Sequence, residues 1–272
     1  MKMFIGLLLA SALVGCKNPS PGGAGASYAH ADYEADLKGE DLGCCIIRDV
    51  LHKPPQALQK GQSNVGETAS WTTADNALQM TLKAPPTIME NTTPSMGVFS
   101  TGLNLGPGSR FSVSATFRKP SDTLYAKGWA VGVVARTGDR DDTADLKRLQ
   151  LTFRVKNSTA ELRVQEIWGP TDAEFKQHAS LPVPQTLYDQ LIDNQLNPPT
   201  FTLKLLVDRK TGTGDAMMKV RNTTYDLGSF NMEYFKASSG DPFTVVGAAL
   251  ANAYDAGKTR SVEVTHFEVW TH

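Results

Sequence analysis

Alternation of apolar and polar side chains constrains the fold of this chain more than any other feature of its sequence. From Trp71 to the C-terminus, short runs with a period of two residues are separated by clusters of Gly, Pro, Asn and Asp. The clearest runs lie at 78–82, 111–117, 149–155 and 201–207. A period of two turns one face of a strand to a core and the other to water, as in antiparallel sheets. We therefore expect an all-β protein in which two antiparallel sheets pack face to face.

Two stretches break the alternation, because 129–135 and 245–251 are apolar at nearly every position. They predict central strands that are covered on both faces. In the last strand, the apolar positions change from even to odd numbers at 265–266, which predicts a β-bulge. A hairpin is also predicted between 201–208 and 217–221, across a loop that contains two glycines.

One hairpin can be placed in register from the sequence. If residues 157–158 form a two-residue turn, Val155 faces Ala160 on the core side. On the other side, Arg154 then lies opposite Glu161, which is a favourable cross-strand pair. Both faces agree on the same register, so this hairpin is the best defined of the predicted elements.

One segment has helical rather than strand periodicity. Leu187, Leu191 and Leu196 fall on one helix face between Pro184 and a double proline. The sequence therefore predicts one short helix at about 185–196. In a β-sandwich such a helix covers a sheet edge, and the alternative is a lid over a binding site.

Length and composition fit a single globular sandwich. The chain has 272 residues, of which 40% are apolar and 20% charged, which excludes disordered, collagen-like and coiled-coil classes. Sandwiches of about 200–250 residues fold as one unit. We therefore predict one domain at 70–272 and an N-terminal extension, 32–69, that packs on it. The net charge of -1 disfavours a nucleic-acid partner, which needs a concentrated basic face.

The first 15 residues have the features of a secretory signal peptide. Lys2 precedes an apolar run at 4–14 that is too short to cross a bilayer as a helix. No later run approaches the length of a membrane-spanning helix.

The segment Leu13-Val14-Gly15-Cys16 is similar to the bacterial lipobox. This resemblance implies cleavage before Cys16 and acylation of its thiol, so the membrane becomes a partner through the lipid. After Cys16, residues 17–27 contain no large apolar side chain. We therefore predict that the lipidated Cys and a flexible tether occupy residues 16–31. Lys17 is not the Asp that retains enteric lipoproteins on the inner membrane. We therefore expect a lipid-anchored protein of the cell envelope, at the outer membrane.

The two remaining cysteines, Cys44 and Cys45, are adjacent. Without further Cys or paired His ligands they do not predict a zinc site. Two alternatives remain open at this point: a strained vicinal disulfide, which export to an oxidising compartment allows, or two buried thiols in a short apolar strand.

The order of the predicted strands resembles that of the concanavalin A-like lectin/glucanase superfamily. The resemblance covers about 70–272 and is most specific at the end, where an apolar strand with small residues, 245–251, is followed by a loop and the strand 261–270. It implies the jelly-roll sandwich that this superfamily shares with laminin-G domains. It implies a carbohydrate-related role only loosely, because one fold hosts many functions.

Sugar recognition on such a fold needs an aromatic platform with amide or charged groups beside it. Trp168 is the first candidate platform, with Tyr125 and Tyr254 after it. Arg163 and Gln165, on the water-facing side of the same predicted strand as Trp168, are the candidate hydrogen-bonding groups. The alternative for Trp168 is an edge residue that covers the sheet.

An acidic loop offers a candidate calcium site. Calcium takes six to eight oxygen ligands, and lectin-like sandwiches hold it in loops of this kind. The alternative is a solvated loop whose charges are neutralised by the basic residues around it. The candidate ligands are Asp139, Asp141, Asp142 and Asp145.

No catalytic residues are predicted. The acidic string at 34–40 has the wrong spacing for the paired carboxylates of retaining glucanases, and 234–237 matches only a fragment of an alginate-lyase motif. The leading hypothesis is a non-catalytic, lectin-like envelope protein that binds a glycan or an envelope partner. The alternatives are a polysaccharide-processing enzyme, such as a glycoside hydrolase or lyase, and a structural subunit of an envelope complex.

Overall fold

The protein is described by a computed structural model, and the chain divides into two units, Met1–Cys44 and Cys45–His272. Apart from Cys44, everything below concerns the second unit. The described residues are 44–50, 59–63, 69–74, 77–84, 95–100, 103, 105–106, 108–119, 129–137, 148–156, 159–168, 174–193, 199–233, 235, 243–251 and 257–271.

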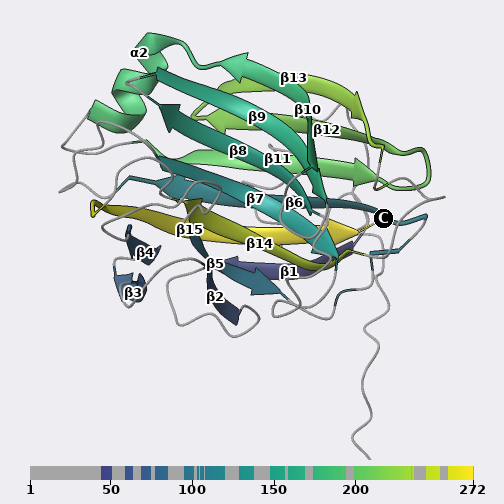
Figure 1. Ribbon diagram of the computed structural model, residues 1–272, viewed down its shortest axis with the longest axis horizontal. Coiled ribbons are helices and arrows are strands. Elements are labelled where there is room, and N and C mark those ends of the chain that lie inside the picture. The colour runs from purple at the N-terminus through teal and green to yellow at the C-terminus, as the bar shows by residue number, and fades with distance from the viewer. Residues whose placement is uncertain are drawn as a thin grey trace, which may run out of the picture. The chain divides into compact units, whose positions relative to one another are not determined.

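Strands in this part of the chain form an eight-stranded and a seven-stranded sheet (Figure 1). The eight-stranded sheet has the order β13-β12-β11-β6-β15-β4-β3, and β1 also pairs with β15. Its strands are β1 (Cys44–Val50), β3 (Ala69–Ala74), β4 (Ala77–Lys83), β6 (Arg110–Arg118), β11 (Phe201–Asp208), β12 (Thr213–Val220), β13 (Thr223–Asn231) and β15 (Thr259–Thr271).

The seven-stranded sheet has the order β10-β9-β8-β7-β14-β5-β2. Its strands are β2 (Gln59–Ser63), β5 (Ser95–Ser100), β7 (Trp129–Thr137), β8 (Arg148–Lys156), β9 (Thr159–Trp168), β10 (Glu174–Pro182) and β14 (Phe243–Ala251). Every pair with a described register is antiparallel. The predicted all-β jelly-roll sandwich of two antiparallel sheets is therefore confirmed. β1 and β2, which precede residue 70, are strands of these sheets.

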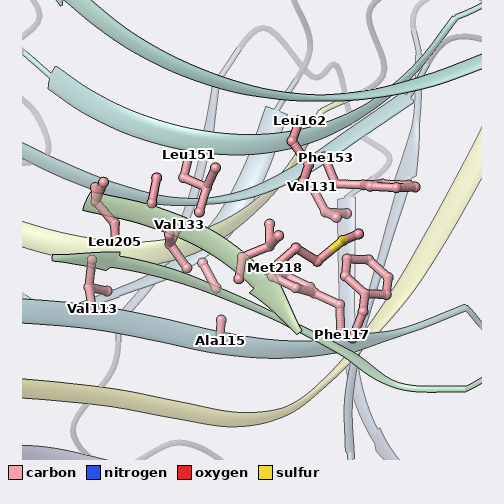
Figure 2. Close-up of a cluster of buried hydrophobic side chains, with 14 of the residues drawn as sticks. Val113, Ala115, Phe117, Val131, Val133, Leu151, Phe153, Leu162, Leu205 and Met218 are labelled. Carbon is pink, nitrogen blue, oxygen red and sulfur yellow. The ribbon is translucent and has the colours of Figure 1, made fainter. Parts of the chain in front are cut away.

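The core lies between the two sheets and consists of the side chains that alternation predicts. Strand β8 has strictly alternating burial from Arg148 to Lys156. Phe153 of the seven-stranded sheet contacts Phe201 of the other sheet, with ring centroids 5.0 Å apart. Figure 2 shows side chains of both sheets meeting in this layer: Val113, Ala115, Phe117, Leu205 and Met218 from one, and Val131, Val133, Leu151, Phe153 and Leu162 from the other.

The register predicted for the first hairpin is confirmed. In β8 and β9, Val155 pairs with Ala160 and Arg154 with Glu161. The predicted bulge is confirmed too, because the register of β15 shifts between Val264 and His266. In the second hairpin the return strand β12 begins at Thr213, earlier than predicted, because the turn occupies only residues 209–212.

The two apolar stretches are central strands, as predicted, because β7 and β14 pair with each other in the middle of the seven-stranded sheet. Cover on both faces is only partial. Val134 and Gly247 are buried on the outer face, whereas Ala130 and Ala249 are half-buried. Val245, opposite Arg136, is fully buried on the same face, and the ring of Phe99 lies over Gly247. This end of the outer face is therefore covered as predicted, and the end with Ala130 and Ala249 is covered only in part.

The predicted helix is present as α2 (Gln185–Tyr188), continued by a π-helical turn, η1 (Asp189–Asp193). Leu187 and Leu191 join the hydrophobic core, as their spacing predicts. Residues 194–198 lie outside the described part of the chain. The helix follows β10 directly and packs near β9, so it covers an end of the core rather than the outer face of the sheet.

A buried carboxyl group ties the edges of the two sheets together. Glu166, on the core side of β9, is fully buried and accepts a hydrogen bond from Nε2 of His178 at 2.8 Å. It also accepts the backbone N–H groups of Glu233 and Phe235, both at 3.0 Å. These two residues follow β13, the edge strand of the other sheet. Glu166 therefore fixes the chain that leaves one sheet against the edge of the other.

A buried guanidinium group fixes a second junction. Arg209, in the turn after β11, is fully buried and donates hydrogen bonds to the carbonyl oxygens of Phe235 at 3.1 Å and Leu105 at 2.9 Å. Its guanidinium lies 5.2 Å from the ring centroid of Phe243. Through these contacts Arg209 joins the segments of Leu105 and Phe235 to the start of β14.

Candidate functional site

Strands β7, β8 and β9 lie side by side in the seven-stranded sheet (Figure 1). Their outward positions carry a concentration of long polar side chains. Along each of these strands, residues that face the core alternate with residues that face outward. We call this surface the arginine face and define it by its outward residues Arg136, Arg148, Gln150, Thr152, Arg154, Lys156, Glu161, Arg163 and Gln165. It carries five cationic side chains and one carboxylate, and all outward positions of these three strands are described.

Glu161 is held among three other side chains of the arginine face and its edge. Its Oε1 lies 2.8 Å from Nε of Arg163 and 3.8 Å from Nη1 of Arg154. The hydroxyl of Ser180, on β10, donates to Oε2 at 3.2 Å. Arg154, Arg163 and Glu161 expose only 17%, 24% and 27% of their side chains. One carboxylate thus lies between two partly buried guanidinium groups.

Electrostatics around Arg154 reflect this crowding of positive charge. Burial lowers the pKa of the Arg154 guanidinium most, and the neighbouring charge of Arg163 lowers it further. The carboxylate of Glu161 acts in the opposite direction and raises that pKa. Because guanidinium groups remain charged at neutral pH, the two cations repel each other and favour any anion that lies between them.

Amide groups extend the arginine face along the same strands. Gln150 and Gln165 lie directly opposite each other, and Nε2 of Gln150 donates to Oε1 of Gln165 at 3.1 Å. After this contact, both amides still have N–H groups that can donate and carbonyl lone pairs that can accept. Side-chain amides placed in this way can bind hydroxyl groups as donor and as acceptor.

Beside the arginine face, the outward positions of β7, β14 and β5 are occupied by small residues and one aromatic ring. The ring of Phe99 lies over Gly97 and Gly247, so that a Cβ on Gly247 would come within 2.4 Å of the ring. A Cβ on Gly132 would meet the carbonyl oxygen of Leu151 at 2.6 Å. The guanidinium of Arg136 lies 5.6 Å from the centroid of Phe99. Glycine is therefore required here by close approach of neighbouring strands and of the ring.

The opposite outer face, on the eight-stranded sheet, is less accessible. Its outward residues Ser112, Lys204 and Met217 are 1%, 1% and 2% exposed. Trp270 is half-buried there, and its indole N–H donates to Glu268 at 3.3 Å. The central outward positions of this sheet therefore present little surface to a ligand.

The structure brings two of the predicted ligand-binding residues together. Arg163 and Gln165 both lie on the arginine face, two positions apart on β9. Trp168 ends β9, but its side chain is outside the described part, and so are Tyr125 and Tyr254. These three remain predictions.

Other predicted sites also lie outside the described residues. They include the signal peptide, the tether and lipidated Cys16, and the acidic loop of Asp139, Asp141, Asp142 and Asp145. Cys44 and Cys45 belong to β1, whose side chains are not described. Within the described ranges, no group of three or more His, Cys, Asp or Glu side chains has an arrangement that could hold a metal ion. Those ranges also contain no helix with the length and hydropathy that crossing a membrane requires.

Sequence reasoning missed several members of the arginine face. Arg154 was predicted only as a partner of Glu161, and Gln150 was covered only by the alternating run at 149–155. Arg136 and Phe99 gave no signal, because the strands that carry them become neighbours of β14 through long-range pairing. Period-two alternation and the hairpin register together predict that Arg148, Gln150, Arg154 and Arg163 share one face. They do not predict which strands lie beyond β7 on that face.

Comparison with solved structures supports the fold. The chain is similar to the CBM2 module of the evolved Dit of Lactobacillus casei BL23 phage J-1 (TM-score 0.52, 11% identity, covering 84% of this chain and 95% of that one). It is also similar to a legume lectin-like domain from Entamoeba histolytica (TM-score 0.52, 12% identity, 81% and 96% covered). A third similar structure is the carbohydrate recognition domain of Emp46p (TM-score 0.51, 13% identity, 83% and 95% covered).

No protein-family model matches the chain, and neither does any curated protein. At these levels of identity the structural likeness establishes a lectin-like jelly-roll sandwich and no more.

Proposed function

We propose that this protein is a lectin-like envelope protein that binds a glycan on the arginine face. The observation that carries the proposal is the convergence of Arg154, Arg163, Gln150 and Gln165 on one outer face, beside half-buried small residues. Amide and guanidinium groups supply directional hydrogen bonds to hydroxyl oxygens, and the small residues let a sugar ring approach the sheet. Similarity to lectin and carbohydrate-recognition domains supports the same class of ligand.

The proposal includes attachment to the envelope through acylated Cys16, at the outer membrane. The segment Leu13-Val14-Gly15-Cys16 and the tether that follows it support this part. Mass spectrometry of the mature chain tests it: the expected N-terminal residue is a Cys that carries acyl chains, and an unmodified Cys16 would contradict it.

A blocking substitution tests the binding site. Ala249 is an outward, half-buried residue opposite Gly132 and Gly97. A tyrosine side chain at this position would occupy the space where a sugar ring meets the sheet. On a glycan array, Ala249→Tyr is expected to reduce binding at least about tenfold, equivalent to about 1.4 kcal/mol.

The matched control is Gln79→Tyr, at an outward, half-buried position of the eight-stranded sheet. It should bind as the unmodified protein does, and thermal unfolding should show both variants folded. If both variants lose binding equally, the arginine face is not the site. If no glycan is bound at all, the role of a structural envelope subunit gains support.

A further inference from the structure

The arginine face differs in charge from the chain as a whole. The whole chain has a formal net charge of -1. On the outward positions of β7, β8 and β9, however, Arg136, Arg148, Arg154, Lys156 and Arg163 accompany the single carboxylate of Glu161. Clustering like charges destabilises a sheet, and Arg136 and Arg148 are even direct cross-strand partners. Such an arrangement favours an anionic ligand.

Glu161 shows which kind of anion fits between the guanidinium groups. Its carboxylate meets Nε of Arg163 at 2.8 Å, and Arg154 approaches the same oxygen from the neighbouring strand at 3.8 Å. Guanidinium groups bind carboxylates and phosphates with paired N–H donors, and the anion that lies between these two is a carboxylate. The amides of Gln150 and Gln165 stand next to this cluster and can bind hydroxyl groups.

The positive charge is also extended along the sheet. Arg148 and Arg154 are six residues apart on β8, which corresponds to roughly 20 Å at the rise of a strand. An isolated ion would engage only one end of this length. A chain with repeated carboxylates would engage both.

We infer that the ligand of the arginine face is an acidic polysaccharide, bound through the carboxylates of its uronate residues by Arg163, Arg154 and Arg148. This inference rests on the proposed glycan binding and names the class of glycan. The carboxylate of a bound uronate shares the two guanidinium groups with Glu161, so Glu161 competes with the ligand and limits its affinity.

The experiment compares tetragalacturonate with cellotetraose, a neutral oligosaccharide of the same length, by titration calorimetry on the full chain in mild detergent. The acidic oligosaccharide is expected to bind at least about tenfold more tightly at low salt, and its affinity should fall as salt is added. Arg163→Gln should weaken tetragalacturonate binding about tenfold. Glu161→Gln should strengthen it severalfold, because it removes the competing charge and nearly preserves side-chain shape.

Arg118→Gln is the matched control. Arg118 lies on the eight-stranded sheet, where its Nε donates to Oε2 of Glu263 at 2.6 Å. Its substitution by Gln changes the net charge of the protein by the same amount as Arg163→Gln. Tetragalacturonate should bind this variant as it binds the unmodified protein. An equal loss in Arg118→Gln and Arg163→Gln would overturn the inference, because the effect would then follow net charge alone.

The remaining outcomes separate the two levels of the proposal. If both tetrasaccharides bind with equal affinity, glycan binding stands and the acidic class is wrong. If neither binds, the acidic class is wrong, and the glycan array decides whether glycan binding fails with it. If tetraglutamate or a single-stranded tetranucleotide binds as tightly as tetragalacturonate, the face is a general polyanion surface and the assignment to a polysaccharide is overturned.

Discussion

Two glutamates on β9, Glu161 and Glu166, show how differently one strand uses the same residue on its two faces. Glu161 faces outward, keeps 27% of its side chain exposed, and lies between guanidinium groups. Glu166 faces the core, is fully buried, and accepts hydrogen bonds from His178 and two backbone N–H groups. Because neighbouring side chains of a strand point to opposite faces, an odd separation of five residues suffices to place one carboxylate in a candidate ligand site and the other in the framework.

The role of each glutamate is therefore set by its partners and not by its residue type. Every partner of Glu166 shown here belongs to the junction between sheet edges, so its loss affects folding. The charged partners of Glu161, Arg154 and Arg163, are long, partly solvated side chains that can change rotamer and accept another anion. Substitutions of each glutamate by the same residue can therefore be compared directly.

Glu166→Gln is expected to have the largest effect. Three donors converge on this carboxyl group, and the amide nitrogen of glutamine would place a further donor against one of them. A buried donor without an acceptor, together with the lost charge-assisted bonds, costs about 3 kcal/mol of unfolding free energy. Urea unfolding measures it, and a loss below about 1 kcal/mol would show that the edge junction does not depend on this group.

His178→Phe is expected to have an intermediate effect. The imidazole of His178 is stacked on Phe230, with ring centroids 5.2 Å apart and planes inclined by 28°, so a phenyl ring keeps the packing. Glu166 keeps both backbone donors and loses only the hydrogen bond from His178. The expected loss of unfolding free energy is about 2 kcal/mol in the same assay. A loss equal to that of Glu166→Gln would mean that His178, rather than the backbone amides, carries the junction.

Glu161→Gln is expected to have the smallest effect on stability. The ion pairs that it removes are partly solvated, and pairs of this kind contribute at most about 1 kcal/mol. Unfolding free energy should therefore change by less than this amount, while tetragalacturonate affinity rises. A loss as large as that of Glu166→Gln would break the comparison, since Glu161 would then be part of the framework.

Much of the fold could be predicted from local patterns. Alternation along 149–155 and the charge pair of Arg154 and Glu161 were sufficient for the hairpin of β8 and β9, because hairpin partners are adjacent in sequence. The change from even to odd positions at 265–266 predicted the bulge, because the side on which apolar residues lie can be read along β15 itself, although its partner β6 is remote in sequence. The start of the short helix was predicted from Pro184, and its buried face from the spacing of Leu187 and Leu191.

Much of the candidate site could not be predicted in this way. Sequence reasoning chose Arg163 and Gln165 because they accompany an aromatic residue, and it gave no reason to join them with Arg136 or Phe99. Those residues are brought to the same face by the pairing of β14 with both β5 and β7, whose partners are separated by more than 100 residues. The buried role of Glu166 was also missed, since a charged residue in a strand normally indicates the solvent side.

Local patterns in the sequence were sufficient for much of the local geometry: the position of the longest strands, the apolar side of each of them, and the register of the hairpin of β8 and β9. These properties depend on contacts between near neighbours and on a period of two residues. Tertiary structure alone decided which strands lie beside each other, and so which outward charges accumulate on one surface and which buried carboxyl group finds its donors. The physical reason is that charge density and burial depend on distances between remote segments, and only the closed pair of sheets fixes those distances.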